Sequence, residues 1–190
     1  MAIDATKVLV GAPNQSNTVG AVQYAPIGTS LPTDATAAAT GFTSAGYVSE
    51  DGLTLTADYS TKDIKDWSLS TVRTLLEEFT GEVSFAFIQT DYEGLCALFG
   101  SSNVTKAGDK ITIKIGAHLP PAQEFVFNMK DGNDRIRVCL PNAQAVLDGD
   151  LTFLASEAIT WNVRLKCGAD TAGETIYIYV DPAATTTTGA

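Results

Sequence analysis

Residues 79–100 read FTGEVSFAFIQTDYEGLCALFG, and within this stretch the apolar pattern changes from the period of a strand to that of a helix. In the first half, Val83, Phe85 and Phe87 occupy alternate positions, which places them on one face of an expected strand. Small or apolar residues fill most of the positions between them. The opposite face of this strand is therefore expected to be partly buried as well.

The second half of the stretch has helical spacing. Tyr92, Leu95, Cys96 and Phe99 lie at i, i+3, i+4 and i+7, on one side of an expected short helix at about residues 91–99. A strand that leads directly into a helix with one apolar side gives that helix one natural docking site, the sheet it has just left. These four residues are therefore the expected docking face of the helix.

The ends of this helix are marked by capping residues. Thr90 followed three residues later by Glu93 has the form of a capping box. Gly100 follows the last apolar position, where a helix commonly ends in a residue that tolerates left-handed geometry. The sequence therefore predicts that the helix begins just after Thr90 and ends at Gly100.

The composition describes a folded chain with an acidic balance. Of 190 residues, 45% are hydrophobic, which is enough for the core of one all-β domain or two small ones. The chain has 22 acidic and 12 basic residues, a net charge of −10. Such a surface repels the phosphates of DNA within the Debye length of about 8 Å. No run approaches the ~20 apolar residues of a membrane span, so no membrane contact is expected.

Residues that carry catalytic or metal chemistry are few. The single histidine is His118, and Cys96, Cys139 and Cys167 lie far apart in apolar patterns, as buried free thiols do. Pairs of acids occur at Glu77-Glu78, Glu50-Asp51 and Asp148/Asp150, and they are expected to be solvated. The sequence therefore predicts no catalytic residue, no metal site and no cofactor.

Alternating apolar residues and turn residues recur along most of the chain. Strands are expected at residues 19–25, 47–48, 53–57, 104–105, 111–115, 125–129, 135–140, 143–147, 151–154, 159–167 and 176–180. Two tight hairpins are expected, at residues 131–134 (DGND) and 148–150 (DGD). The expected fold is all-β, an antiparallel β-sandwich or barrel with the short α-helix flanking it.

The segment from Asp58 to Trp67 mixes charges of both signs with aromatic and aliphatic residues. It is either a solvated loop or a protein contact surface. We favour a contact surface, because the segment is long for a loop without structure. The candidate contact residues are Asp58, Tyr59, Lys62, Asp63, Ile64 and Trp67.

The next segment, Leu69 to Phe79, gives conflicting signals. Its apolar residues fit helical spacing, whereas its β-branched residues favour a strand. Periodicity alone predicts a helix. Residues 1–18 have almost no core pattern and are expected to form an N-terminal arm, while residues 182–190 form a low-complexity tail that is expected to be disordered. The β-domain is thus expected at residues 19–181.

Three segments, in this order, resemble a known protein family. Residues 20–34 (GAVQYAPIGTSLPTD), 46–53 (GYVSEDGL) and 82–100 (EVSFAFIQTDYEGLCALFG) are similar to parts of the tail tube (major tail) proteins of long-tailed phages, the siphoviruses, that infect actinobacteria. The resemblance covers about residues 19–100 well. The rest of the chain is similar only through its run of β-hairpins.

The resemblance implies a structural protein without enzymatic activity. Six copies form a ring, rings stack helically into a tube, and neighbouring subunits pool their strands around a lumen through which DNA passes without specific binding. A long loop, here about residues 49–70, reaches a neighbouring ring, and residues 71–79 form a strand. For residues 71–79 we therefore prefer the strand that the resemblance implies to the helix that periodicity predicts.

The resemblance also implies partners and a location. The partners are other copies of the chain, a tape measure protein and a tail terminator. The location is the virion tail, assembled in the cytoplasm of the bacterial host. An acidic lumen lets DNA slide, but Lys114, Lys130, Arg135 and Arg137 lie on strands that are candidates to line it, which leaves the charge of the lumen open.

Two alternatives remain at this point. A monomeric β-sandwich that binds carbohydrate or another host-surface ligand predicts an exposed aromatic platform, with Trp67 and Tyr59 as candidates. A hydrolase has only the pairs of acids in its favour and is the weakest hypothesis.

Overall fold

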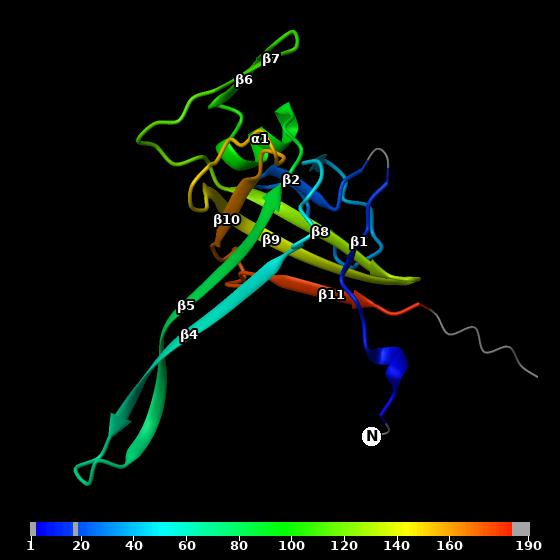
Figure 1. Ribbon diagram of the computed structural model, residues 1–190. Coiled ribbons are helices and arrows are strands. Elements are labelled where there is room, and N and C mark those ends of the chain that lie inside the picture. The colour runs from blue at the N-terminus through cyan, green and yellow to red at the C-terminus, as the bar shows by residue number, and fades with distance from the viewer. Residues whose placement is uncertain (1–2, 17–18, 184–190) are drawn as a thin grey trace, which may run out of the picture.

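The computed structural model describes residues 3–16 and 19–183 (Figure 1). The fold is all-β, and every strand pairing between its elements is antiparallel. The elements are η1 (Ala5–Lys7), β1 (Ala12–Pro13), β2 (Val22–Pro26), β3 (Thr43–Ser44), β4 (Thr54–Lys65), β5 (Thr71–Phe87), α1 (Tyr92–Phe99), β6 (Val104–Ala107), β7 (Lys110–Ile113), β8 (Gln123–Asp131), β9 (Asp134–Leu147), β10 (Trp161–Cys167) and β11 (Tyr177–Asp181).

Most strands belong to one sheet. Its order is β3-β2-β8-β9-β10-β5-β4, with β1 alongside β8 and β11 alongside β9, while β6 and β7 form a separate hairpin. The sheet curls over itself, because Phe85 on β5 meets Phe127 on β8 with ring centroids 5.4 Å apart although two strands separate them in the sheet. The curled sheet encloses the core like a sandwich, and its ladder does not close into a barrel.

The segment between β3 and β4 links the two ends of the curled sheet. At one end the Ala45 amide donates to the carbonyl of Val22 on β2. At the other end the Ser49 amide donates to the carbonyl of Ala86 on β5. The strand expected at Tyr47-Val48 is therefore reduced to a single bridge between Val48 and Phe87. The residues on either side of it, Ala45 and Ser49, bond to two different strands.

Helix α1 covers the open side of the core, directly after β5, and residues Gly94 to Phe99 are buried. The capping box predicted at Thr90 and Glu93 is wrong. The N-cap is Asp91, whose carboxylate accepts from the Gly94 amide at 2.9 Å. Thr90 is engaged elsewhere, since its hydroxyl accepts from the indole N–H of Trp161 at 2.9 Å. Gly100 ends the helix with φ 79°, as predicted.

One of the two predicted tight hairpins is confirmed. Asp131 pairs with Asp134 across a two-residue turn, in which Gly132 has φ 55°. The hairpin predicted at residues 148–150 is wrong, because residues 151–154 form no strand. Instead β9 continues to Leu147 and pairs with β10 across the loop at residues 148–160.

Strand β9 is long enough to hold two partners along one edge. Its residues 143–147 pair with β10 and its residues 135–139 pair with β11. The last strand therefore joins β9 rather than forming a hairpin with β10.

The prediction of a helix from the periodicity of residues 69–79 is also wrong, and the strand that the resemblance implies is correct. Residues 71–79 belong to β5 and pair with β4 in a ladder that runs from Thr54↔Ser84 to Lys65↔Thr71. The pairing is possible because β4 supplies a partner along the whole length. The segment expected as a loop at residues 49–70 is thus largely one strand of a long hairpin.

The two ends of the chain are described in part. Within the expected N-terminal arm, Ala12 and Pro13 pair with Lys130 and Met129 on β8. Residues 1–2 and 17–18 of this arm lie outside the described residues. The expected disordered tail also lies outside them from residue 184 onward.

Candidate functional site

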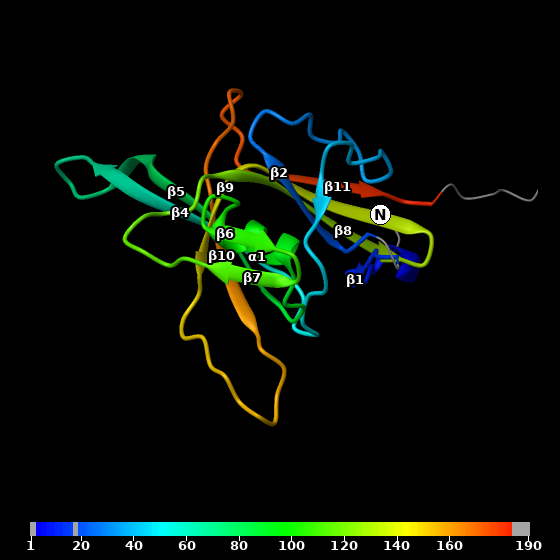
Figure 2. The ribbon, with the colours of Figure 1, turned by 90° about the horizontal axis from the view of Figure 1, so that it is seen from above.

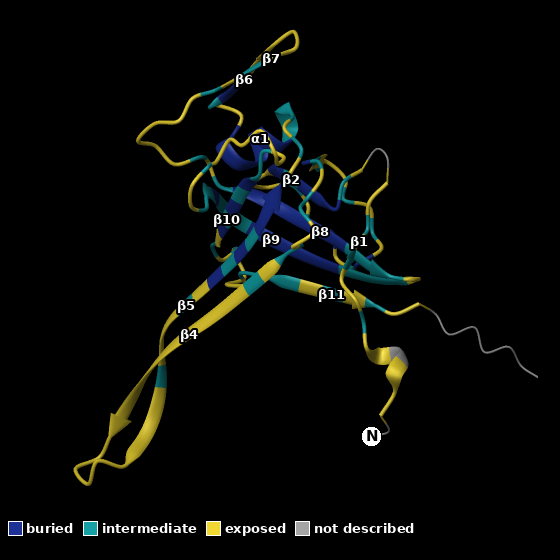
Figure 3. Cartoon of the chain, in the orientation of Figure 1, coloured by how far each residue is buried: buried dark blue, intermediate teal, exposed yellow. Residues whose placement is uncertain are grey.

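The β4–β5 hairpin projects far beyond the core. β5 pairs with β10 only from Gly81 to Phe87, and its outer residues pair with β4 alone. We call residues 58–80 the hairpin arm. Figures 1 and 2 show the arm extending away from the curled sheet, and in Figure 3 nearly all of it is exposed. Near the base of the arm, Tyr59, Leu76 and Phe79 line a hollow together with residues of the segment 173–178.

The arm carries large apolar side chains in solvent. The exposed ones are Tyr59, Ile64, Trp67, Leu69, Val72 and Leu76. An isolated two-stranded hairpin is marginally stable in water, and contiguous exposed apolar surface in a monomer marks an interaction site. The arm therefore has the composition of a surface that a protein partner covers.

The candidate contact residues all lie on this arm, but not in one cluster. The Tyr59 ring rests on Phe79, with centroids 4.8 Å apart. Trp67 lies beyond the end of β4, in the connecting turn, and its side chain is fully exposed. Tyr59 is six residues from the end of β4 at Lys65, which corresponds to about 20 Å of extended strand.

The charged candidates are held by neighbours on the arm. Lys62 forms an ion pair with Glu77 at 3.8 Å. The carboxylate of Asp63 accepts from the hydroxyls of Thr74 at 2.7 Å and of Thr71 at 3.3 Å. Asp58 pairs with Thr80 in the ladder and is exposed. These contacts hold the two strands together and leave the apolar side chains free for a partner.

The turn at the tip is an ordered structure. The Asp66 carboxylate accepts from the Ser68 hydroxyl at 2.7 Å and from the Ser70 amide at 2.9 Å. These hydrogen bonds, that of Ser68 first, lower the pKa of Asp66. Leu69 has φ 66°, a left-handed conformation that costs an L-residue about 1–2 kcal/mol. The turn thus presents Trp67 on a defined backbone.

Sequence reasoning missed three exposed residues of the arm. Leu69, Val72 and Leu76 were assigned to the apolar side of a helix, where burial would explain them. The β-branched residues nearby did indicate a strand. An exposed two-stranded hairpin has no buried face, however, so its apolar residues need not recur at every second position.

The predicted docking face of α1 lies in the core for the most part. Leu95, Cys96 and Phe99 are buried and Tyr92 is half-buried. Ala97 and Leu98 are buried as well, so the helix is covered on more sides than one.

A hydrogen bond ties this helix to β2. The Tyr24 hydroxyl donates to the Glu93 carboxylate at 2.8 Å. Burial and then this bond raise the pKa of Tyr24 above its usual value.

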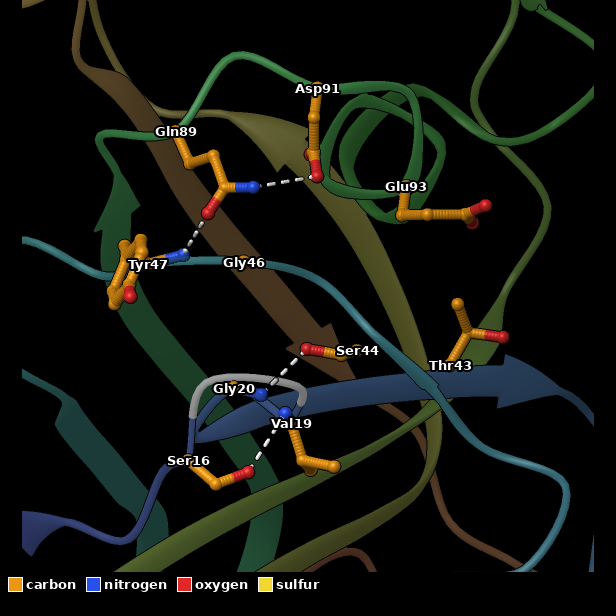
Figure 4. Close-up of a pocket in the computed structure, with 10 residues that line it drawn as sticks. All are labelled: Ser16, Val19, Gly20, Thr43, Ser44, Gly46, Tyr47, Gln89, Asp91 and Glu93. Carbon is orange, nitrogen blue, oxygen red and sulfur yellow. Dashed lines mark hydrogen bonds between the residues drawn. The ribbon is translucent and has the colours of Figure 1, made fainter.

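A hollow of about 440 Å³ lies between the start of α1 and the β2–β3 region (Figure 4). Several of the polar groups that line it form hydrogen bonds with other groups of the same chain. The Gln89 side chain accepts from the Tyr47 amide at 3.2 Å and donates to Asp91 at 2.9 Å. The Ser44 hydroxyl accepts from the Gly20 amide at 2.7 Å. Figure 4 shows Glu93 pointing away from Asp91, so the two acids do not converge on a ligand.

The side chains of Cys139, Cys167 and His118 are protonated or hydrogen-bonded within the chain. Burial raises the pKa of Cys139 and of Cys167 to about 12, so both thiols are protonated at neutral pH. His118 Nε2 lies 2.8 Å from Asn103 Oδ1 on the surface. Within residues 3–16 and 19–183, no three His, Cys, Asp or Glu side chains are grouped to hold a metal ion. The helices in the same residues include none long and apolar enough to cross a membrane.

Arg137 is the one candidate lumen residue that is buried. Its guanidinium donates to the carbonyls of Asp34 and Ala37, both at 2.7 Å, and to the Asn128 side chain at 2.7 Å. It therefore anchors the loop after β2 to the outer face of the sheet and is not available to line a channel.

Comparison with known proteins identifies the family of this chain. The family model described as phage tail tube protein matches residues 1–189. No curated protein matches the chain significantly. Since the family model covers almost the whole sequence, the chain belongs to the phage tail tube protein family.

Proposed function

We propose that this protein assembles into rings of six copies that stack into a tail tube, and that the hairpin arm makes the contact between rings. Membership of the family assigns it a structural role in the tail of a phage virion. That family is not an enzyme class. The hexamer and the siphovirus type of tail are what the resemblance to siphovirus tail tube proteins implies.

The exposed hairpin arm is the observation that supports this proposal most directly. It presents six large apolar side chains that are exposed in the single subunit. Burying apolar surface contributes about 25 cal/mol per Å². A neighbouring subunit that covers the arm supplies the stabilisation that the single subunit lacks.

A role as a conduit for DNA ejection is consistent with the charge of the chain. The net charge is −10, and negative potential along a lumen disfavours binding of phosphates. With Arg137 buried, one basic side chain fewer is available to oppose that potential. The resemblance also implies assembly in the host cytoplasm, on a tape measure protein and up to a tail terminator.

Electron microscopy tests the proposal. Negatively stained images of the purified protein are expected to show rings or tubes. The double substitution Trp67→Ala and Ile64→Ala is expected to abolish stacking, because it removes two exposed apolar side chains from the arm. Its unfolding midpoint is expected to match the unmodified protein, since neither side chain contributes to the core.

The matched control is Ser60→Ala, which changes an exposed residue of the same arm without removing apolar surface. It is expected to form tubes normally. If the unmodified protein remains monomeric at every concentration and temperature tested, and virions show no rings, the proposed function is wrong.

The carbohydrate-binding alternative has no observation in its favour. It requires Trp67 and Tyr59 to form one aromatic platform. The ladder separates them by about 20 Å, and the Tyr59 ring packs at a tilt against Phe79 instead.

A further inference from the structure

Two segments outside the hairpin arm carry opposite charge. The loop between β9 and β10, which we call the acidic loop (residues 148–160), contains three acids and no lysine or arginine. The segment that includes β6 and β7, which we call the basic segment (residues 103–119), contains Lys106, Lys110 and Lys114 against Asp109 as its one acid. In a chain with net charge −10, this concentration of lysine is unusual.

These charges are not neutralised within the chain. Among the described residues the ion pairs are Lys62–Glu77, on the hairpin arm, and Arg164–Asp148. The second pair takes up Asp148 at the base of the acidic loop and leaves Asp150 and Glu157 without a basic partner. The three lysines of the basic segment likewise have no acidic partner in this part of the chain.

Both segments also expose apolar side chains. In the acidic loop Phe153 is 66% exposed and Leu154 is 53% exposed. In the basic segment Ile115 is 72% exposed and Leu119 is 66% exposed. Each segment thus combines exposed apolar side chains, which mark a protein contact, with unpaired charges, which favour a partner of opposite charge.

The ladder of the β6–β7 hairpin places Lys110 on one face and Lys106, which pairs with Ile111, on the other. Thr105 pairs with Thr112, and Ala107 pairs with Lys110. The Lys114 amide donates to the carbonyl of Asn103 at 2.9 Å, which extends the ladder by one step. Lys110, Thr112 and Lys114 therefore lie at alternate positions on a common face, with the Cα atoms of the two lysines about 13 Å apart along the strand.

The two segments project from different parts of the subunit. Figure 1 shows the β6–β7 hairpin at the end of the molecule beyond α1. Figure 2 shows the loop between β9 and β10 extending from one side of the body. Two complementary patches on separate projections are suited to pairing between copies, because each copy then keeps one patch free for the next neighbour.

We propose that the acidic loop of one copy docks on the basic segment of a second copy, in a head-to-tail contact that repeats from subunit to subunit. The inference rests on the proposed function, which makes another copy of the chain the partner. Asp150 and Glu157 pair with Lys110 and Lys114, and Phe153 is buried against Ile115 and Leu119. The charges select the partner and speed its encounter, while the apolar side chains provide most of the affinity.

Charge reversal tests this contact. One variant carries Asp150→Lys and Glu157→Lys, and the other carries Lys110→Glu and Lys114→Glu. Each variant alone is expected to need at least tenfold more protein to assemble, because like charges then meet at every contact. An equimolar mixture of the two is expected to assemble with alternating copies, since each reversed patch meets an opposite one.

A single chain that carries all four reversals is expected to assemble like the unmodified protein. The control for the acidic-loop variant is Glu50→Lys with Asp51→Lys, which makes the same change in net charge at exposed positions elsewhere. Assembly is measured by sedimentation and electron microscopy, and circular dichroism checks that each variant is folded.

The outcomes separate this contact from the tube itself. If the unmodified protein assembles and both reversed variants do so equally well, the tube stands and this contact is wrong. The contact is also wrong if neither the mixture nor the fourfold variant recovers assembly. Normal assembly with altered retention of duplex DNA by the lysine variant would assign the basic segment to DNA instead. If the unmodified protein does not assemble at all, the proposed function fails as well.

Discussion

Arg137 shows how one buried side chain joins distant parts of the sequence. It lies on β9, and its guanidinium satisfies two backbone carbonyls of the loop after β2 and one side chain on β8. The same loop is tied at Ala35, whose amide donates to Asp181 at the end of β11 at 2.6 Å. The cover over the outer face of the sheet therefore depends on a few polar contacts between segments far apart in the chain.

Replacing Arg137 with methionine is expected to lower the free energy of unfolding by about 3 kcal/mol, because it leaves buried acceptors without a donor. Residues 27–42 are expected to become sensitive to protease, since the bonds to Asp34 and Ala37 are lost. Urea unfolding and limited proteolysis measure the two effects. Arg135→Ala is the control, because Arg135 bonds only to the carbonyls of its own turn. Equal stability of the two variants would contradict this role of Arg137.

Glu124 predicts a dependence of stability on pH. It is buried on β8, one carboxylate oxygen accepts from the Gly28 amide at 2.7 Å, and the other has no partner among the described residues. Burial raises the pKa of this carboxyl above its usual 4.5, and the amides of Gly28 and Thr29 oppose the rise. The folded state therefore keeps the proton to a higher pH than the unfolded chain does.

Because the unfolded chain loses this proton first, stability is expected to fall as the pH rises from 4.5 through the raised pKa, and then to level off. Glu124→Gln is expected to remove this decline, so the difference in unfolding free energy between variant and parent should grow over the same window. Urea unfolding at a series of pH values measures it. Glu157→Gln, at an exposed position, is the control. Parallel curves for Glu124→Gln and the parent would rule out this effect of burial.

Polar contacts of this kind could not be predicted from the sequence. Arg137 looked like one more basic residue on a strand, because nothing local indicates a loop that returns from a hundred positions earlier. The helix cap was misplaced for a related reason. Thr90 and Asp91 both have the chemistry of an N-cap, and the choice depends on Trp161, which lies on another strand and takes the Thr90 hydroxyl.

At the scale of elements, the spacing of apolar residues was sufficient to predict a strand where one face of that strand is buried. Alternating apolar residues correctly predicted strand β10, and turn residues correctly predicted the tight hairpin between β8 and β9. The pattern failed at residues 69–79, where the arm is exposed and its apolar residues face no core. It failed again at residues 151–154, which form no strand. The resemblance corrected the first error because it does not depend on a buried face in the single subunit.

The two halves of the β4–β5 hairpin are expected to differ in hydrogen exchange. Amides at Gly81–Phe87 lie in the part of β5 that also pairs with β10, whereas those of the arm have β4 as their one partner strand and open readily. In the monomer, peptides from residues 58–80 are expected to exchange much faster than those from β5 near the core. In assembled tubes the arm is expected to become protected. Exchange measured by mass spectrometry on both forms tests this, and an arm that stays unprotected in tubes would show that no neighbour covers it.

At the scale of the molecule, the side chains proposed to make the contacts between copies differ from those that form the core. The core is enclosed by the curled sheet and α1 and involves none of the exposed residues of the arm. The exposed residues of the arm, the acidic loop and the basic segment, on three projections, lie outside that core, although Val104 of the basic segment belongs to it and Leu151 and Ile159 of the acidic loop pack against it. Substitutions of these exposed residues are therefore expected to change assembly while leaving the subunit folded.

The two tryptophans report on these processes separately. Trp161 is buried in the core and Trp67 is fully exposed at the tip of the arm. In a Trp161→Phe variant, assembly is expected to shift the Trp67 emission to shorter wavelength and to reduce its quenching by acrylamide several-fold. In a Trp67→Phe variant, the Trp161 emission is expected to change only on unfolding. If Trp67 stays accessible in tubes that microscopy confirms, the arm tip does not contact the next ring, and the contact between rings must lie on another of the projections.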